Sequence, residues 1–275
     1  MGLQPYATPL ERVWYFAIRI FCVLVLICLV LPILVIIPIS FTSETMLIYP
    51  MPSLSLRWYK EFFNSVMWTL SMKNSFIIAF ATTGLATVLG TLAALGLTMS
   101  TFPFKRVVTG IMIMPMMVPI VISAVGIYFF FAWMGLTGTY LGMILAHTAL
   151  AAPFVVITVT ATLQGFNRNQ IRAGTSLGAS PAVVFFMITL PQILPGVISG
   201  ALFAFVASFD EVVVALFIAG PEQYTLPRQM FAGIRETYNP TIASVATMLI
   251  VVSVMLLVTM ELLRRRNERL RGSRQ

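Results

Sequence analysis

Long apolar stretches recur along most of the chain, and short polar segments separate them. A helix needs about 20 mostly apolar residues to cross the hydrocarbon layer of a membrane. The stretches that meet this length lie at residues 16–40, 74–99, 107–133, 139–163, 193–219 and 241–263. Their length favours helices over barrel strands, which alternate over roughly 10 residues. The pattern therefore predicts an all-α membrane protein with six transmembrane helices.

The first stretch carries Arg12 and Arg19 at its start, as a signal peptide would. Its apolar run is longer than the ~7–15 residues of a typical signal core, and no small-residue cleavage site follows it. We therefore expect a retained membrane anchor.

Composition supports a membrane location. The 275 residues are 59% hydrophobic and 9% charged, with a mean hydropathy of +0.95. Soluble domains are roughly 45–50% apolar and about 25% charged. These values argue against a cytosolic enzyme, a disordered chain and a secreted disulfide scaffold. The two cysteines, Cys22 and Cys28, both lie in the first apolar stretch and are too few for a disulfide framework.

The positions of the basic residues predict the orientation. With both termini inside, twelve of the seventeen Lys and Arg residues lie on the inner side. Because basic residues favour cytoplasmic loops, this orientation, with both termini cytoplasmic, is the expected one. The basic segment 264–275 then rests on anionic lipid, and the net charge of +8 requires no nucleic acid.

This reading divides the chain into three parts. Residues 1–73 form an anchor span and an outer loop, residues 74–263 a core with an inner loop at 164–192, and residues 264–275 a cytoplasmic tail. The outer loop is expected to contain an amphipathic interfacial helix, because aromatic side chains cluster there among polar residues. These aromatic residues are Trp58, Tyr59, Phe62, Phe63 and Trp68.

Several prolines interrupt the spans or lie beside them. Membrane helices tolerate such residues when neighbours satisfy the freed backbone groups. They are Pro32, Pro38, Pro115, Pro119, Pro153 and Pro195. They act either as simple kinks or as hinges of a bundle that must move, and the sequence leaves both possibilities open.

The inner loop contains a pattern typical of two short helices. Ala173, Leu177, Val184 and Met187 are spaced to share one apolar stripe. Ser180 followed by a proline is typical of a helix start. A loop of this length in a compact protein usually has a function.

One spacing in this loop is distinctive. Arg172-Ala173-Gly174 is followed by three residues, Gly178, nine residues, and then Ile188, one residue and Leu190-Pro191. The arrangement resembles the EAA motif of permease subunits of binding-protein-dependent ABC importers, which reads Glu-Ala-Ala, three residues, Gly, nine residues, Ile, any residue, Leu-Pro. Arg172 replaces the glutamate and Gly174 the second alanine.

This resemblance implies a type I ABC importer permease fold in a bacterial inner membrane, with roughly residues 70–263 covered. It also implies that the loop couples the chain to a separate ATPase. The implied partners are a second permease subunit, two ATPase subunits and an extracytoplasmic solute-binding protein. The sequence contains no G-x-x-x-x-G-K-[ST] phosphate loop, so the energy must come from a partner or from an ion gradient. No cofactor is implied.

A second run, Ser208-Phe209-Asp210-Glu211 followed by three valines, resembles the spermidine/putrescine branch of this family. Related importers of opines and other small solutes share much of it. The sequence therefore favours polyamine transport, and leaves open another solute (an opine, an aminophosphonate or a sugar). An ion-coupled carrier or a channel is a further alternative, although the internal symmetry typical of such carriers is not evident.

Asp210 and Glu211 are candidate pathway or gate residues, together with Ser208 and Phe209. A carboxylate within a bilayer usually faces a cavity or a partner. The acids either contact a cationic solute or form an ion pair, for example with Arg228. Adjacent side chains on a helix point about 100° apart, so the two acids are not expected to face one cavity together.

Catalytic and metal-binding functions are not indicated. His147 is expected to be a hydrogen-bonded core residue, since no Cys, Asp or Glu accompanies it at metal-ligand spacing. No Ser-His-Asp set or carboxylate pair resembles an active site, so we predict a transport protein and not an enzyme.

Overall fold

The computed structural model describes residues 8–45, 48, 52–236 and 239–272, and most of them lie in helices. Contacts along the chain define two compact units, residues 1–64 with 237–250 and residues 65–236 with 251–275. Five helices are long and apolar enough to cross a membrane, and a sixth span is obtained if a bent helix pair is counted as one. Within the described ranges, the predicted all-α class is confirmed.

The first unit contains α1 (Pro9–Ile39), α2 (Arg57–Asn64) and the first residues of α12 (Thr241–Gly272). A capping box begins α1: the Thr8 hydroxyl accepts from the Glu11 amide, and the Glu11 carboxylate accepts from the Thr8 amide. No residue of α1 is buried, and its hydropathy reaches 3.6. Such a helix requires lipid or another apolar surface around it.

The predicted amphipathic helix of the outer loop is α2. Trp58 and Phe62, one turn apart, are buried, whereas Phe63 is exposed. The Tyr59 hydroxyl lies 2.7 Å from Ser40 Oγ, and the Ser40 carbonyl accepts from Ser244 Oγ at 3.2 Å. These bonds tie α2 and the start of α12 to the end of α1 within the first unit.

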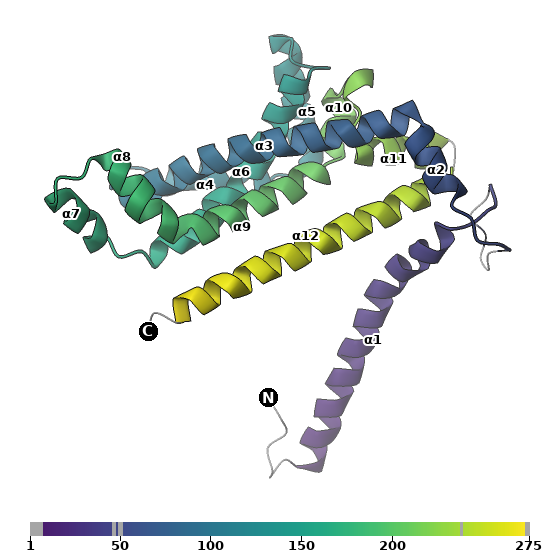
Figure 1. Cartoon of the computed structure of the whole chain (residues 1–275), viewed down its shortest axis with the longest axis horizontal. Helices are drawn as coiled ribbons and strands as arrows, with labels where there is room; N and C mark the ends of the chain where they lie inside the picture. Colours follow the sequence, from purple (N-terminus) through teal and green to yellow (C-terminus); the bar gives the residue numbers. More distant parts are fainter. Residues whose placement is uncertain (1–7, 46–47, 49–51, 237–238, 273–275) are drawn as a thin grey trace. The chain divides into compact units, whose positions relative to one another are not determined.

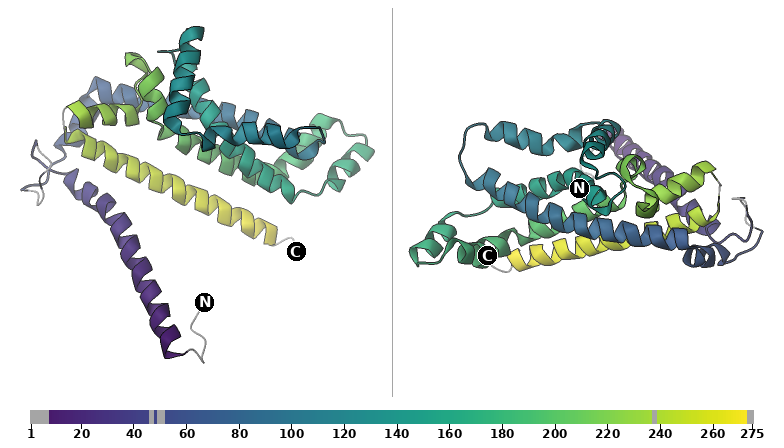
Figure 2. Two further views of the ribbon diagram at one scale, coloured as in Figure 1. Left: turned by 180° about the vertical axis from the view of Figure 1, so that it is seen from behind. Right: turned by 90° about the horizontal axis from the view of Figure 1, so that it is seen from above.

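The second unit is built on three long helices that lie side by side (Figure 1 and Figure 2): α3 (Val66–Met99), α6 (Tyr140–Gln164) and α9 (Leu190–Phe209). Their shared core contains small and branched side chains such as Ala86, Val155 and Ile193, all with no exposed surface. Small residues allow membrane helices to approach closely.

The third predicted span is broken. Residues 107–133 were expected to form one helix, but α4 (Lys105–Met117) and α5 (Ile120–Met134) meet at an angle of 105°. Pro119 lacks an amide proton and disfavours the helical conformation at Val118, which is extended (φ −77°, ψ 134°). At this position the proline therefore ends one helix, and does not only bend it.

The fifth predicted span, residues 193–219, is also not continuous. It begins earlier, with α8 (Pro181–Val184) and the π-helical turn η1 (Phe185–Thr189), and α9 ends at Phe209. A separate short helix, α10 (Val213–Ile218), follows; after it come η2 (Pro221–Gln223) and α11 (Leu226–Glu236).

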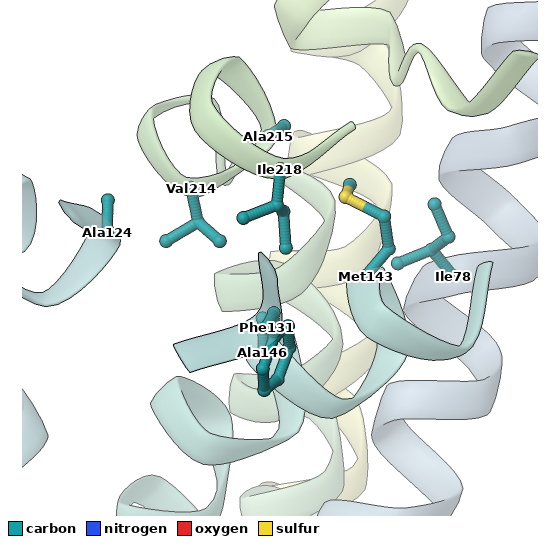
Figure 3. Close-up of a cluster of buried hydrophobic side chains, with 8 residues drawn as sticks. All are labelled: Ile78, Ala124, Phe131, Met143, Ala146, Val214, Ala215 and Ile218. Carbon is teal, nitrogen blue, oxygen red and sulfur yellow. The ribbon is translucent and has the colours of Figure 1, made fainter. Parts of the chain in front are cut away.

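A cluster of buried apolar side chains fixes the position of α10 (Figure 3). It joins α10 to α3, α5 and α6. Its members are Ile78, Ala124, Phe131, Met143, Ala146, Val214, Ala215 and Ile218. The break between α9 and α10 is therefore held between two packed helices.

Candidate functional site

Two places in the second unit contain the residues singled out from the sequence. One is the segment 164–192, called the coupling segment, which joins α6 to α9 and contains α7 (Asn169–Ser176), α8 and η1. The other is the acidic break, residues 210–212, between α9 and α10.

The turn between α7 and α8 has the geometry of a glycine-terminated helix. Gly178 has φ of +80°, a conformation that side chains with a Cβ disfavour. The Ala179 amide donates to the Gly174 carbonyl at 3.2 Å, and the Gly178 amide donates to the Thr175 carbonyl at 3.0 Å, as in a Schellman motif. Ser180 then caps α8 through the Val183 amide, which confirms the helix start predicted there.

The coupling segment folds back on itself at Gly174. A Cβ placed on this residue would lie 2.7 Å from Ile188 Cδ1 and 3.3 Å from Val184 Cγ2. Gly174 and Val184 are buried. The small residue in the first half of the motif thus contacts the isoleucine in its second half, although 14 positions separate them in sequence.

The other motif residues lie on either side of this contact in the sequence. Arg172 and Ala173 are exposed on α7, whereas Leu190 and Pro191 are the first residues of α9. The Gln192 side chain donates to Gln170 and to the Ile188 carbonyl, which links α7 to α9. The structure therefore brings both halves of the motif together at one end of α9.

One prediction for this segment is wrong in part. Ala173, Leu177, Val184 and Met187 were expected to share one apolar stripe, but only Val184 is buried. Leu177 is 89% exposed and Met187 75% exposed, because the turn at Gly178 separates the two helices. Phe186, which sequence reasoning did not single out, is 63% exposed beside Met187. The segment thus presents apolar side chains to its surroundings.

The acidic break lines a cavity of about 460 Å³. The cavity wall consists mainly of apolar side chains, together with the two carboxylates. The lining residues are Pro115, Met116, Val118, Ile120, Leu150, Phe154, Val206, Ala207, Asp210 and Glu211. The expectation that the two acids do not share a cavity is therefore wrong, because α9 ends before Asp210 and both acids line this cavity.

The two carboxylates have different surroundings. Glu211 is half-buried, and its Oε1 accepts from the Val214 amide at 2.9 Å, so that it caps the start of α10. Asp210 is exposed, and its carboxylate has no hydrogen bond or ion pair with any described residue. Asp210 is thus the carboxylate that is open to the cavity.

The two other residues of the run face away from the cavity. Ser208 is buried against His147 of α6, whose Nδ1 lies 2.9 Å from Ser208 Oγ and 3.1 Å from the Ser208 carbonyl. The expected hydrogen-bonded core histidine is therefore confirmed. The Phe209 ring packs against Phe76 and Phe205, with ring centres 5.1 and 5.5 Å apart.

Arg228 does not pair with the acids. Its guanidinium donates to the carbonyl of Ala219 at 2.8 Å and stacks on the Tyr224 ring at 3.6 Å. Partial desolvation lowers the pKa of this guanidinium, yet arginine keeps its charge in proteins. The ion-pair interpretation of Asp210 and Glu211 through Arg228 is therefore wrong.

Metal binding has no structural basis in the described ranges. No group of three or more His, Cys, Asp or Glu side chains lies together there.

The second unit consists of packed apolar helices with two internal breaks. It contains a cavity and a segment with exposed apolar side chains. These features are those expected of a membrane-spanning transport subunit. Residues 86–271 match the family described as the inner membrane component of binding-protein-dependent transport systems. The chain belongs to this family. It is accordingly a transport permease of the inner membrane and not an enzyme, and it works with a solute-binding protein.

Two curated relatives extend the comparison. The spermidine/putrescine transport system permease protein PotC of Haemophilus influenzae is 32% identical over 255 residues, which cover 92% of this chain and 98% of the relative. The putrescine transport system permease protein PotI of Escherichia coli (strain K12) is 33% identical over 229 residues, covering 80% of each. The resemblance inferred from the motifs is thereby confirmed.

Solved structures confirm the fold. A chain of a bacterial ABC transporter involved in alginate import superposes with a TM-score of 0.74 at 13% identity, covering 95% of this chain and 99% of the other. A chain of a bacterial alginate transporter, solved in complex with an alginate-bound periplasmic protein, gives a TM-score of 0.66 at 15% identity, covering 93% and 96%. The architecture is that of a type I ABC importer permease.

Proposed function

We propose that this chain is one of two membrane subunits of an ATP-driven importer that carries polyamines such as putrescine and spermidine. The cavity lined by Asp210 and Glu211 is the observation on which this proposal rests. Its volume of about 460 Å³ lies in the range of small-molecule sites. The names of the curated relatives, which include spermidine/putrescine and putrescine permeases, support the same solute class.

The cavity chemistry suits an alkyl diamine. The carboxylate of Asp210, which has no partner in the described part of the chain, offers a counter-charge for an ammonium group. Met116, Leu150 and Phe154 offer apolar walls for methylene groups. An aromatic ring such as that of Phe154 also attracts cations through its face. An anionic solute would be repelled by both acids.

The coupling segment is proposed as the contact with the ATPase. Leu177, Phe186 and Met187 are exposed apolar side chains at one end of the helices, and such groups mark protein interaction sites. The buried contact between Gly174 and Ile188 makes the segment stiff enough to transmit movement into α9. Because the sequence has no phosphate-binding loop, nucleotide chemistry belongs to the partners.

The proposed assembly contains this chain, a second permease subunit, two ATPase subunits and an extracytoplasmic binding protein. Both termini and the coupling segment face the cytoplasm, in agreement with the excess of Lys and Arg on that side. Residues 1–73 then serve as anchor and outer loop, 74–263 as the transport core and 264–275 as a basic tail near anionic lipid.

Competition for uptake tests the solute class. Cells carrying the complete importer should accumulate radiolabelled putrescine, and a strain lacking this chain should not. Unlabelled spermidine should compete, whereas octopine, 2-aminoethylphosphonate and maltose should not. Indifference to both polyamines, with inhibition by one of the other solutes, would assign the importer to that solute.

A further inference from the structure

The end of α9 has a hydrogen bond that the helix itself does not supply. The last four carbonyls of a helix lack intrahelical donors, and those of α9 become free at the break before Asp210. Nδ1 of His147 lies 3.1 Å from the carbonyl of Ser208, one of these four. His147 is 1% exposed and Ser208 4% exposed, so this bond is closed to water.

The chemistry of the two groups assigns the proton. A carbonyl oxygen only accepts, and Nε2 of His147 is buried without a hydrogen-bond partner in the described ranges. A hydrogen on Nε2 would therefore be a buried donor without an acceptor, so the hydrogen is assigned to Nδ1. Nδ1 lies within hydrogen-bond distance of the Ser208 carbonyl (3.1 Å) and of Ser208 Oγ (2.9 Å), and these contacts orient the ring toward the end of α9.

The bond lies behind the cavity wall. His147 precedes Leu150 and Phe154 by three and seven positions on α6, and residues at these spacings share one face of a helix. Leu150 and Phe154 line the cavity, whereas His147 does not. The histidine therefore lies next to the pathway without contacting what passes through it.

The break is thus held from both sides. His147 binds the end of α9, and Glu211 caps the start of α10 through the Val214 amide. Asp210 lies between these two bonds, exposed to the cavity. With both ends fixed, the backbone at Asp210 has little freedom to turn its Cα–Cβ bond away from the cavity.

We propose that His147 is a positioning residue of the translocation pathway. By donating to the Ser208 carbonyl, it fixes the end of α9 so that the Asp210 carboxylate faces the cavity. The role in transport rests on the proposed function, in which Asp210 meets the solute. The orientation of position 210 is a property of the chain alone and can be measured separately.

Two substitutions form a matched pair. In His147→Asn, the amide nitrogen takes the place of Nδ1 and can still donate to the Ser208 carbonyl. In His147→Gln, the amide nitrogen takes the place of Nε2, so the side chain stays polar and of similar size but the bond is lost. Ser208→Ala removes the hydroxyl and keeps the carbonyl, and it should behave like His147→Asn.

Thiol labelling in the assembled importer measures the orientation. Cys22 and Cys28 are exchanged for serine, and Asp210→Cys is introduced; the labelling rate with aminoethyl methanethiosulfonate is then recorded in membrane vesicles. Val206→Cys, one turn earlier on the same cavity wall, is the control position. His147→Gln should slow labelling at position 210 about fivefold, as expected for loss of one buried hydrogen bond, and leave position 206 within about twofold. His147→Asn should leave both rates unchanged.

Uptake of radiolabelled putrescine gives the second measurement. His147→Gln should raise KM about fivefold, and in an Asp210→Asn background it should have no further effect. Equal labelling rates in all variants, equal slowing at positions 206 and 210, or equal effects of Asn and Gln would overturn the proposal. If putrescine is not transported, only the proposed solute class fails, because the labelling result does not depend on the solute.

Discussion

Gly174 and Ile188 show how a single residue determines the shape of the coupling segment. The space beside Gly174 is filled by the end of the Ile188 side chain and by Val184. Helix propensity alone would favour alanine over glycine at this position in α7 by about 1 kcal/mol. Packing therefore disfavours a larger side chain at position 174, whereas helix propensity favours replacing the glycine. The size of the introduced side chain decides whether the segment keeps its fold.

The variants Gly174→Ala and Gly174→Leu test this contact. Alanine should be tolerated, with uptake within about twofold of the parent, because the Ile188 methyl group 2.7 Å from the new Cβ can rotate away. Leucine should push α7 off α8 and reduce uptake about fivefold or more, because overpacking costs about 1–3 kcal/mol. Uptake and the amount of ATPase that co-purifies with the importer are the measurements. Equal activity of both variants would show that the contact is not required.

The two acids of the break are predicted to differ in role. Asp210→Asn should raise the KM for putrescine without changing thermal stability, because this side chain has no partner among the described residues. Glu211→Ala should destabilise the protein by about 0.5–2 kcal/mol, because the Val214 amide loses its acceptor. Glu211→Gln keeps an acceptor oxygen and is the control. Thermal unfolding in detergent and uptake kinetics separate the two effects, and the assignment is wrong if Asp210→Asn lowers stability while Glu211→Ala does not.

At the scale of elements, the pair α7–α8 has an apolar edge that no part of its own unit covers. Leu177 is 89% exposed at the turn, directly before Gly178. If this edge binds the ATPase, Leu177→Asp should abolish co-purification of the ATPase, since a charge would enter an apolar contact. Leu177→Met keeps an apolar side chain of similar volume and should retain the ATPase. Retention by the aspartate variant would move the contact away from this turn.

The sequence predicts helices well where their apolar runs are long and uninterrupted. The helices α3, α6 and α12 start or end within a few residues of the predicted spans, and the loop helices α7 and α8 were expected from their spacing. The two breaks were missed, because an apolar window averages over a short segment in which the helix is interrupted. In one of them, Pro119 offered a signal that was interpreted only as a kink or hinge.

The other break also has a signal in the sequence. Asp210 and the β-branched Val212 have low helix propensity, and they lie where α9 ends and before α10 begins. Missing this break led to a wrong expectation for the site, because the break turns both acids toward one cavity. The contact between Ser208 and His147 lies beyond sequence reasoning, since 61 positions separate the two residues.

At the scale of the whole molecule, the chain combines an acid-lined cavity with a segment that exposes apolar side chains, and its sequence contains no G-x-x-x-x-G-K-[ST] phosphate loop. Membership in the permease family agrees with nucleotide use by a separate subunit. The coupling segment and the acidic break lie at opposite ends of α9, so under the proposed function a shift of its first residues, Leu190 and Pro191, would be passed along one helix toward Asp210. We therefore expect solute movement to depend on a partner ATPase.

Reconstitution of the complete importer in vesicles tests this requirement most directly. Radiolabelled putrescine is supplied on the side of the binding protein, and ATP or a non-hydrolysable analogue on the side of the coupling segment. We expect accumulation with ATP, none with the analogue, and none in vesicles that contain only the permease subunits. Accumulation in vesicles that contain this chain without an ATPase and without nucleotide would contradict this expectation.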